Sequence, residues 1–555
     1  MSNTLRWFIA LSIAVTGLLG AALSAQEADP PVSEGVDDAA YWTSVFRGET
    51  VLRIDVYLTQ DKWNTMEPDR PQSRGRGGPE GRPDQAPRRP NGVVPQIENQ
   101  QATPPGHEPG QGIPPAMPGP MPDASEYEYV PAKVVINGEV LERAGLRFKG
   151  NSSYRSSARS MKRPLKIDTN KFVDGQEFHG RTKLNLSISF KDPAYIREKL
   201  GYGVYRAAGL PSPGVGWSTV TLHFEDTEQK QVLGPYVVIE QVDKAYMERK
   251  FGEEAGNGVL FKPEIPEWRY LGENPSAYAR YDIKFGAKNQ DMVLRFAQLI
   301  RLINEAPDDV FRTQIGSMID LDMLAGYLAA TSLLVNLDSY IGMIHNYYIF
   351  IDPRDGRARL LPWDVNEAFG GFGLGAPNHV LVNWSIQRPW VQERPLLKRL
   401  FEMAEFRERY RDKIKSLMAG AFTKPRLEAL IDKYMKVIAP LVQNTQGPAE
   451  VQEMHQSIAG NRLAPDQAPN GRPQRSRGAG GVPALIPFIM ARIDSVQAQF
   501  DGTRTGEIIS ERLRGPKRDR RPGRGRGLSE QPRPPLENQP AEPATPGPSE
   551  SGGAE

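Results

Sequence analysis

The sequence predicts an α+β protein with two lobes, the first rich in strands and the second mostly helical. Runs with the alternation or β-branched content of strands recur between residues 51 and 241. From residue 292 onward, apolar residues recur instead at helical spacing. No internal repeat with a period of about 20–50 residues is present in the sequence, which argues against a repeat architecture.

The first half contains several strand candidates and one clear helix. Residues 51–58 alternate as a strand does, and the turn Asn137-Gly138 predicts a hairpin over residues 129–148. Further strands are expected over residues 164–168, 182–188, 218–224 and 234–241. A helix is expected over residues 194–208, started by Asp192-Pro193 and stopped by Gly209.

The second half reads as helices around a short hairpin. The spacing of apolar residues predicts helices over residues 292–304, 321–334, 395–417, 426–442 and 485–500. Between them, residues 346–351 and 358–361 read as short strands joined by a turn at residues 352–356.

Proline, glycine and arginine are concentrated in three stretches. Segments of this composition bury little apolar area, so we expect disordered insertions at about residues 67–123 and 460–482 within one domain spanning residues 41–502. A disordered basic and proline-rich tail is expected over residues 515–555. Residues 511–528 hold eight Lys or Arg against two acids, which suits a solvated linker, a substrate-docking arm or a tether to an anionic surface.

The N-terminus has the pattern of a secretory signal peptide. Arg6 precedes an apolar run over residues 7–23, and small residues around Ala25 suit cleavage, so residues 1–25 are expected to be removed. A retained membrane anchor is the alternative. We therefore expect a secreted or periplasmic protein without stable membrane insertion after cleavage.

Charge and cysteine content exclude several classes of function. The formal net charge of +2 gives no global field that would suggest binding to nucleic acid. The chain has no cysteine, which excludes disulfides, thiolate zinc sites and cysteine nucleophiles.

Three polar residues occur at the ends of apolar segments. Asp338 follows an apolar helix, Asn346 opens an apolar strand and Asp364 closes one. Two carboxylates and an amide form an oxygen-rich set that suits Mg²⁺ or Mn²⁺ better than zinc. Alternatively, Asp338 and Asp364 are helix caps or turn residues, and composition does not decide between the two interpretations.

A possible phosphate-binding loop lies in the first half. A strand enters the Gly-Asn-Ser loop at residues 150–153, and a strand with lysine leaves it. Backbone amides and hydroxyls of such a loop can hold phosphate oxygens, although most loops of this composition are only turns.

In this order, the motifs resemble the CotH kinase family over about residues 45–440. The stretches that carry the resemblance are residues 147–153, 162–167, 183–186, 196–200, 234–242, 336–340, 345–348 and the Leu-Pro-Trp-Asp of residues 361–364.

The resemblance implies a two-lobed atypical protein-kinase fold that binds ATP with Mg²⁺ or Mn²⁺ and phosphorylates Ser or Thr of a protein substrate. Asp338 then resembles the catalytic aspartate, and Asp364 the metal-binding aspartate of a kinase DFG motif. Asn346 resembles the metal-binding asparagine, but it follows Asp338 by eight residues instead of about five.

For the first lobe, the resemblance assigns the nucleotide contacts. Lys166 or Lys162 would bind phosphate, and Glu198 would be the helix acid paired with that lysine. Ser152 and Ser153 would cover the phosphates. Glu240, at a strand end where the lobes should join, would contact the adenosine.

Two other functions remain open. The chain could be a non-catalytic binding or assembly protein of the cell envelope on the same fold. It could also transfer a phosphoryl or nucleotidyl group to a non-protein acceptor such as a glycan.

Overall fold

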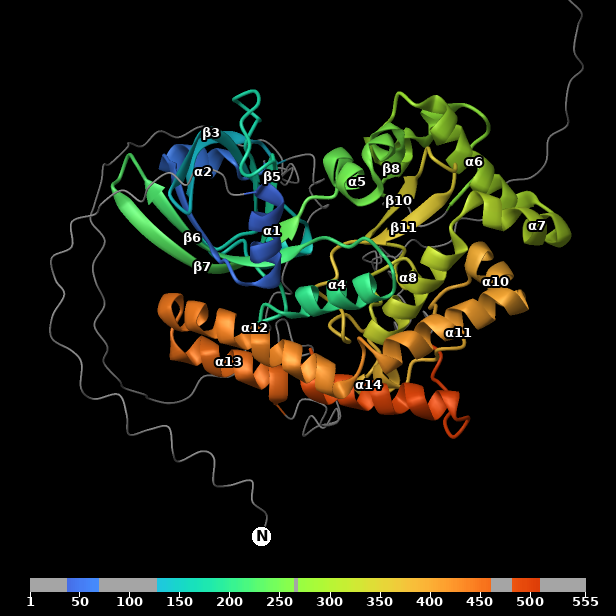
Figure 1. The fold of residues 1–555 in the computed structure, drawn as a ribbon. Helices are drawn as coiled ribbons and strands as arrows, with labels where there is room; N and C mark the ends of the chain where they lie inside the picture. The colour runs from blue at the N-terminus through green and yellow to red at the C-terminus, as the bar shows by residue number, and fades with distance from the viewer. Residues whose placement is uncertain (1–36, 69–126, 264–267, 461–481, 510–555) are drawn as a thin grey trace, which may run out of the picture. The chain divides into compact units, whose positions relative to one another are not determined.

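The computed structural model describes residues 37–68, 127–263, 268–460 and 482–509. The expected signal peptide and basic tail lie outside the described residues. So do the expected insertions, apart from a few residues at their edges. Within the described ranges the chain mixes strands and helices (Figure 1), which confirms the α+β class.

The first half forms a closed barrel with the strand order β1-β2-β3-β4-β5-β7-β6. Closure comes from β1, which pairs antiparallel with β2 and parallel with β6. The strands are β1 (Leu52–Leu58), β2 (Val130–Ile136), β3 (Glu139–Phe148), β4 (Leu165–Asp168), β5 (Lys183–Ser187), β6 (Val215–Phe224) and β7 (Gln229–Glu240). The strand predictions are confirmed, with β7 extending further towards the N-terminus than expected.

Alternation along the strands separates the barrel core from its outer face. Leu146, Ile167 and Leu186 are fully buried with the other inward residues. The register places Arg147 opposite Lys166, and Lys166 opposite Asn185. Since neighbouring residues on a strand point to opposite faces, these polar side chains share the outer face of β3, β4 and β5.

Most of the helices pack around a second and larger core. They are α4 (Arg197–Ala207), α6 (Gln290–Glu305), α7 (Asp308–Met318), α8 (Leu321–Leu334), α9 (Asn378–Val382), α10 (Pro395–Glu402), α11 (Ala404–Ala419), α12 (Lys424–Thr445), α13 (Pro448–Ala459) and α14 (Leu485–Phe500). Helix α5 (Lys244–Phe251) packs in a smaller, separate cluster. Helices α1 (Asp38–Arg47), α2 (Gln60–Thr65) and α3 (Ser152–Ser156) pack on the barrel core, and 3₁₀ turns lie at Glu253–Asn257 and Pro275–Tyr281.

Two predicted helices differ clearly from the structure: α4 begins at Arg197 instead of residue 194, and one long stretch is divided. The stretch 395–417 forms two helices, α10 and α11, because the backbone of Met403 is extended and interrupts the helix. Apolar periodicity continues across this break, so it gave no signal of the turn. None of the helices in the described ranges is long and apolar enough to cross a bilayer.

A four-stranded sheet accompanies the helices. Its order is β11-β10-β8-β9, with β8 (Val259–Phe261), β9 (Ile283–Phe285), β10 (Tyr347–Ile351) and β11 (Ala358–Pro362). The predicted hairpin is confirmed as β10 and β11, which pair Tyr347 with Pro362. This pairing fixes Asn346 and Trp363 beside each other at the open end of the hairpin.

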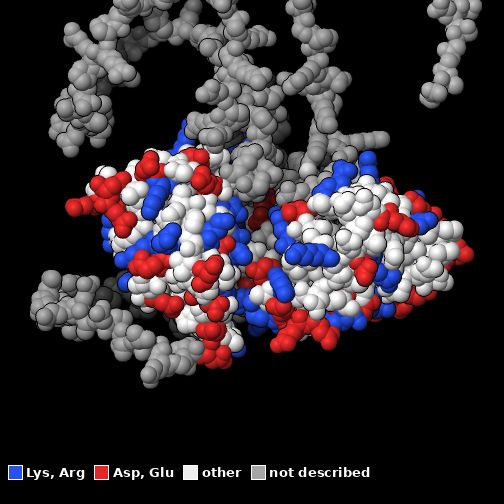
Figure 2. Space-filling view, turned by 90° about the horizontal axis from the view of Figure 1, so that it is seen from above, with Lys and Arg blue, Asp and Glu red and all other residues white. Residues whose placement is uncertain are grey.

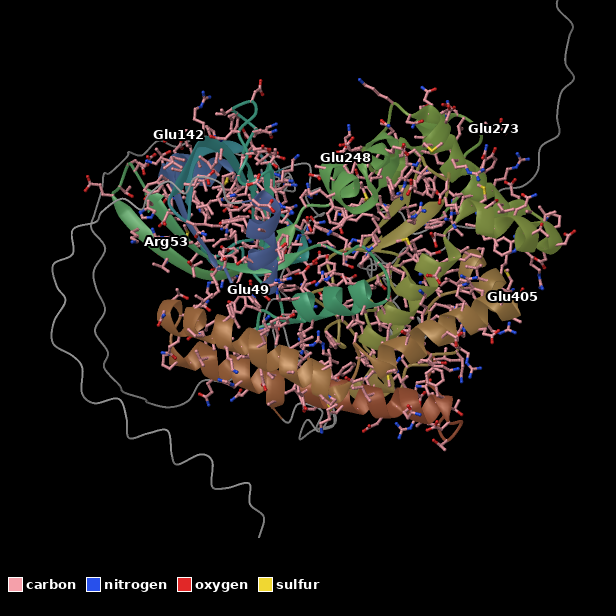
Figure 3. The ribbon with its side chains drawn as sticks, viewed as in Figure 1. Glu49, Arg53, Glu142, Glu248, Glu273 and Glu405 are labelled. Atoms are coloured by element: carbon pink, nitrogen blue, oxygen red, sulfur yellow. The ribbon has the colours of Figure 1, made fainter. Side chains whose placement is uncertain are left out.

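Charged side chains cover the outside of the described residues. Glu142, Glu273 and Glu405 are exposed at the periphery in Figure 3. On the face seen in Figure 2, acidic and basic side chains are interspersed, in keeping with the small net charge.

Candidate active site

Asp338 and Asn346, two residues of the predicted site, are in direct contact. The Asn346 side-chain amide donates a hydrogen bond to Asp338 Oδ2 over 2.8 Å. Asn346 is buried and Asp338 is partly exposed. Since a carboxylate only accepts hydrogen bonds, this contact uses the Asn346 NH₂ and leaves its amide oxygen for a cation.

Asp364 lies next to this pair, two residues beyond β11. The backbone amide of Trp363 donates to the Asn346 carbonyl oxygen over 3.2 Å, which joins the two segments. Asp364 has a left-handed backbone with φ 51°, and its amide donates to the Tyr202 hydroxyl on α4 over 3.0 Å. Such a conformation is unfavourable for a non-glycine residue and is often found at functional sites.

The charges around Asp364 come from both halves of the protein. Water reaches the residue, although protein groups crowd its carboxyl. That crowding raises its pKa, Lys149 opposes the rise, and the negative charge of Asp338 adds to it. Lys262 also lowers the pKa. The carboxylates therefore repel each other, and a cation placed between them would relieve this repulsion.

Lys149 is the lysine of the barrel that faces the acids. Burial lowers its pKa, while Asp364 and Glu198 raise it. Its ammonium lies 6.0 Å from the centre of the Trp363 ring, next to Asp364 in the chain. Lys149 follows β3 directly and precedes Gly150, whose φ of 76° turns the chain away.

Sequence reasoning missed Lys149. It favoured a lysine on the strand that leaves the Gly-Asn-Ser loop over the lysine that enters it. A usable signal was the spacing of Arg147 and Lys149, because strand alternation places both on one face. Arg147 is paired with Lys166 of the neighbouring strand.

Glu198 is the buried acid of α4 and belongs to the same group. Only 3% of the residue is exposed, no side chain hydrogen-bonds to its carboxylate in the described residues, and the Val365 backbone amide is its polar neighbour. Burial and the charge of Asp364 raise its pKa well above the ordinary value, and Lys149 lowers it. A buried carboxylate without a directly bound cation is costly, and the nearby charge of Lys149 offsets part of that cost.

The two lysines predicted to bind phosphate lie in different places. Lys166 donates to Gln241 Oε1 over 2.8 Å, and burial with the charges of Arg147 and Lys149 lowers its pKa to about 7. It therefore lies on the same face as Lys149.

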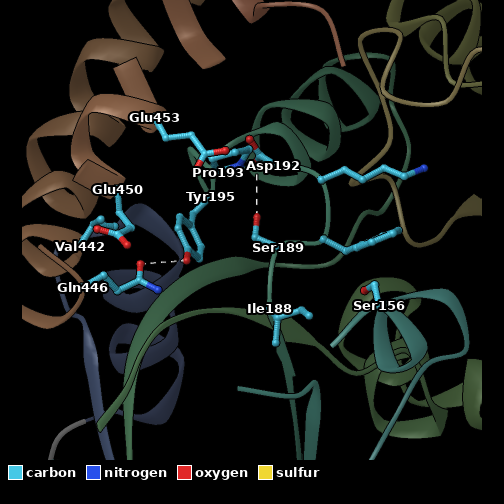
Figure 4. A pocket seen from close by; sticks show the side chains of 12 residues that line it. Ser156, Ile188, Ser189, Asp192, Pro193, Tyr195, Val442, Gln446, Glu450 and Glu453 are labelled. Atoms are coloured by element: carbon cyan, nitrogen blue, oxygen red, sulfur yellow. Dashed lines mark hydrogen bonds between the residues drawn. The ribbon is translucent and has the colours of Figure 1, made fainter. Parts of the chain in front are cut away.

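Lys162 is engaged elsewhere. It donates to the Tyr195 hydroxyl over 2.7 Å, and burial lowers its pKa to about 7. Tyr195 in turn lines a cavity of about 370 Å³ and donates to Gln446, directly after α12 (Figure 4). No interaction with Asp364 or Glu198 contributes to the Lys162 pKa shift.

Glu240 is engaged in a buried ion-pair network. Arg181 donates to one of its oxygens over 2.5 Å and the Gly214 amide to the other over 2.9 Å. Burial would raise its pKa, but Arg181, Gly214 and Arg249 prevail and lower it. This occupied carboxylate anchors strand β7, and a contact with adenosine would have to displace one of these donors.

Ser152 and Ser153 open the short helix α3, directly after Lys149 and Gly150. Ser152 is exposed and Ser153 is partly exposed, so both hydroxyls are accessible to a ligand. Both serines thus lie within four residues of Lys149 in the chain.

Glu367 is a further acid that the sequence did not single out. It is buried and forms an ion pair of 2.9 Å with Lys191. Burial raises its pKa to about 7, Lys191 opposes the rise, and Asp338 and Asp364 add to it. Its position three residues after Asp364 was the available signal.

The donor set fits a hard divalent cation bound together with phosphate. Within the described ranges, no three His, Cys, Asp or Glu side chains are grouped closely enough to hold a metal by themselves. Asp364 and the Asn346 amide oxygen would supply one carboxylate and one neutral oxygen. Mg²⁺ is commonly held in this way, by one or two carboxylates plus substrate phosphates and water.

Comparison with known proteins identifies the family. The family model described as CotH kinase protein matches residues 146–470, which is more than half of the chain. The chain belongs to the CotH kinase family. The match contains every residue of the candidate site described above.

A sequence relative and a solved structure illustrate how low the similarity to known proteins is. The inner spore coat protein H of Bacillus subtilis (strain 168) is 23% identical over 281 residues, covering 49% of this chain and 72% of the relative. Among solved structures, the Helicobacter pylori proinflammatory kinase CtkA aligns with 58% of this chain and 91% of its own, at 11% identity. Its TM-score of 0.17 is too low to support an argument about the fold.

Proposed function

We propose that this protein is a kinase of two lobes that transfers the γ-phosphoryl group of ATP, with Mg²⁺ or Mn²⁺, to Ser or Thr of a protein substrate outside the cytoplasm. The observation that carries the proposal is the convergence of Lys149 and Glu198 with Asp338, Asn346 and Asp364. Lys149 follows β3, Glu198 lies on α4, and the other three residues lie in the loops that follow α8 and β11. Family membership supports the kinase class.

The residues have distinct roles in this mechanism. Asp338 orients the acceptor hydroxyl and accepts its proton as the oxygen attacks the γ-phosphorus. Asp364 and Asn346 present oxygens to the divalent cation, which neutralises phosphate charge when bound. Lys149 binds the phosphates from the barrel side.

Glu198 supports Lys149 in this proposal. No direct ion pair joins them, yet each shifts the pKa of the other. Nucleotide binding would stabilise the charged lysine between phosphate and Glu198. Lys166, on the same face, adds positive charge. Ser152 and Ser153 remain candidates to cover the phosphates.

Phosphoryl transfer from labelled ATP by the purified full chain tests the proposal. With Mg²⁺ or Mn²⁺, the wild type should label itself or a co-secreted protein on Ser or Thr. Asp338→Asn and Asp364→Asn should each reduce the rate by ~100-fold or more, because each removes charge that positions the reactants.

Asp322→Asn is the matched control, since Asp322 lies exposed on α8 and pairs with Lys413. It should leave transfer unchanged. If the wild type labels no acceptor, or if Asp364→Asn transfers at the wild-type rate, the kinase assignment is wrong. In the first case a binding or assembly role on this fold becomes the better explanation.

A further inference from the structure

The loop between Asp338 and Asn346 is longer than in ordinary kinases and strained. Its spacing of eight residues exceeds the usual five or so. Ile344 and Asn346 have left-handed backbones, with φ of 58° and 53°. Each such residue costs about 1–2 kcal/mol, so contacts from outside the loop must hold this shape.

The loop is tightly folded on itself at Gly342. A Cβ at this position would lie 1.9 Å from the Leu337 carbonyl oxygen, so only glycine fits. The amides of Gly342 and Ile344 both donate to the Ser339 carbonyl oxygen. These turns satisfy amides, but they leave the carbonyls of residues 340–342 pointing away from the loop's own donors.

The segment before α10 satisfies those three carbonyls in succession. Arg394 Nε donates to the Tyr340 oxygen over 3.3 Å, and Arg394 Nη2 donates to the Gly342 oxygen over 3.0 Å. Between them, the Val391 amide donates to the Ile341 oxygen over 3.0 Å. Arg394 is 7% exposed, so its guanidinium is a buried strut and not a surface contact.

Space for movement exists on this side of the loop. A cavity of about 260 Å³ is lined by Trp268, Tyr340, Ile344 and Arg394, among others. If the guanidinium were shortened, the loop could relax into this space. Tight packing therefore does not hold the loop on this side; two hydrogen bonds from Arg394 and one from the Val391 amide do.

We infer that Arg394 is a positioning residue that fixes Asp338 and Asn346 for phosphoryl transfer by clamping the 339–345 loop. This inference rests on the proposed function. Arg394 does not touch the reactants. A displacement of about 1 Å at a catalytic group can lower a rate by ~100-fold, so loss of the clamp should act mainly on kcat.

The test compares Arg394→Gln and Arg394→Lys with changes at a second arginine that binds backbone carbonyls, the partly buried Arg399. Arg399 also donates to three backbone carbonyls, those of Leu302, Ile303 and Ala306, but at the end of α6. Arg394→Gln should lower kcat by ~10- to 100-fold with KM for ATP within about twofold, and lysine should restore part of the loss. Arg399→Gln should lower Tm without this loss of kcat.

Two further readouts separate positioning from general damage. In an Asp338→Ala background, Arg394→Gln should reduce the residual rate no further. Hydrogen–deuterium exchange of the amides in residues 339–346 should accelerate in Arg394→Gln but not in Arg399→Gln, and this measurement needs no activity. If exchange is unchanged, or if the two variants lose kcat equally, Arg394 is not a positioning residue. If exchange accelerates in Arg394→Gln but the wild type shows no phosphoryl transfer, Arg394 still holds the loop and the kinase assignment is wrong.

Discussion

At the scale of single residues, polar side chains at the ends of apolar segments were the useful signal for the candidate site. Asp338, Asn346 and Asp364 could be predicted because each ends or begins a buried segment, where a polar side chain needs a purpose. Lys149 and Glu367 were harder to predict, since the spacing signals that point to them are also common among surface charges. Their significance comes from tertiary neighbours that lie far away in the chain.

Lys149 and Lys162 provide a direct test of which lysine serves the nucleotide. Lys149→Met should reduce phosphoryl transfer by ~100-fold or more, since it removes the charge opposite Asp364 and Glu198. Lys162→Met should retain most activity, because Lys162 binds Tyr195 instead. Rates at saturating ATP would decide, and equal losses in the two variants would contradict the assignment of Lys149.

Glu367 should make stability depend on pH. Its pKa is raised from 4.5 to about 7 in the folded protein, so the folded state holds a proton that the unfolded state releases. This contribution is present at pH 5 and should be lost as pH rises towards 8, lowering the free energy of unfolding by about 3 kcal/mol.

Glu367→Gln should flatten that pH dependence, measured by urea unfolding across the same range. Glu450→Gln, an exposed acid at the start of α13, is the control and should keep the wild-type slope. Parallel curves for wild type and Glu367→Gln would rule out this titration.

At the scale of elements, local patterns worked where the contacts are local. The predicted helices over residues 321–334 and 485–500 coincide with α8 and α14. The hairpins were predictable because their turns carry Asn-Gly or Asp-Gly signals. Helix α4 was expected from its apolar spacing, but the contacts that hold its N-terminal end come from residues far away in the chain.

Arg197 fixes α4 to the loop beyond Asp364. Its guanidinium is buried and donates to the carbonyl oxygens of Ala368, Phe369 and Pro483, and its Nε lies 3.7 Å from Asp192. Arg197→Met should lower the free energy of unfolding by about 3–5 kcal/mol, since it leaves Asp192 buried without its counter-charge.

Arg206 of the same helix is the matched control. It is exposed at the other end of α4, so Arg206→Met should cost only ~1 kcal/mol or less in denaturant unfolding. A similar loss in both variants would show that Arg197 has no special role in holding α4.

At the scale of the whole molecule, the α+β class and the order of strands before helices followed from periodicity. Closure of the barrel did not, because it depends on the parallel pairing of β1 with β6, whose paired residues are 166 positions apart. The convergence of Lys149 with Asp364 likewise depends on how the barrel meets the helices. The sequence pattern predicted Asp338 and Asp364, whereas Lys149 could be identified as the lysine that faces them only from the fold.

Diffraction from crystals grown with Mn²⁺ and a non-hydrolysable ATP analogue tests the central claim most directly. We predict an anomalous manganese peak about 2.2 Å from an Asp364 oxygen and the Asn346 amide oxygen. The analogue's phosphates should lie against Lys149, with Asp338 facing the γ-phosphate. Nucleotide bound elsewhere, or manganese absent from Asp364 at saturating concentrations, would contradict the account.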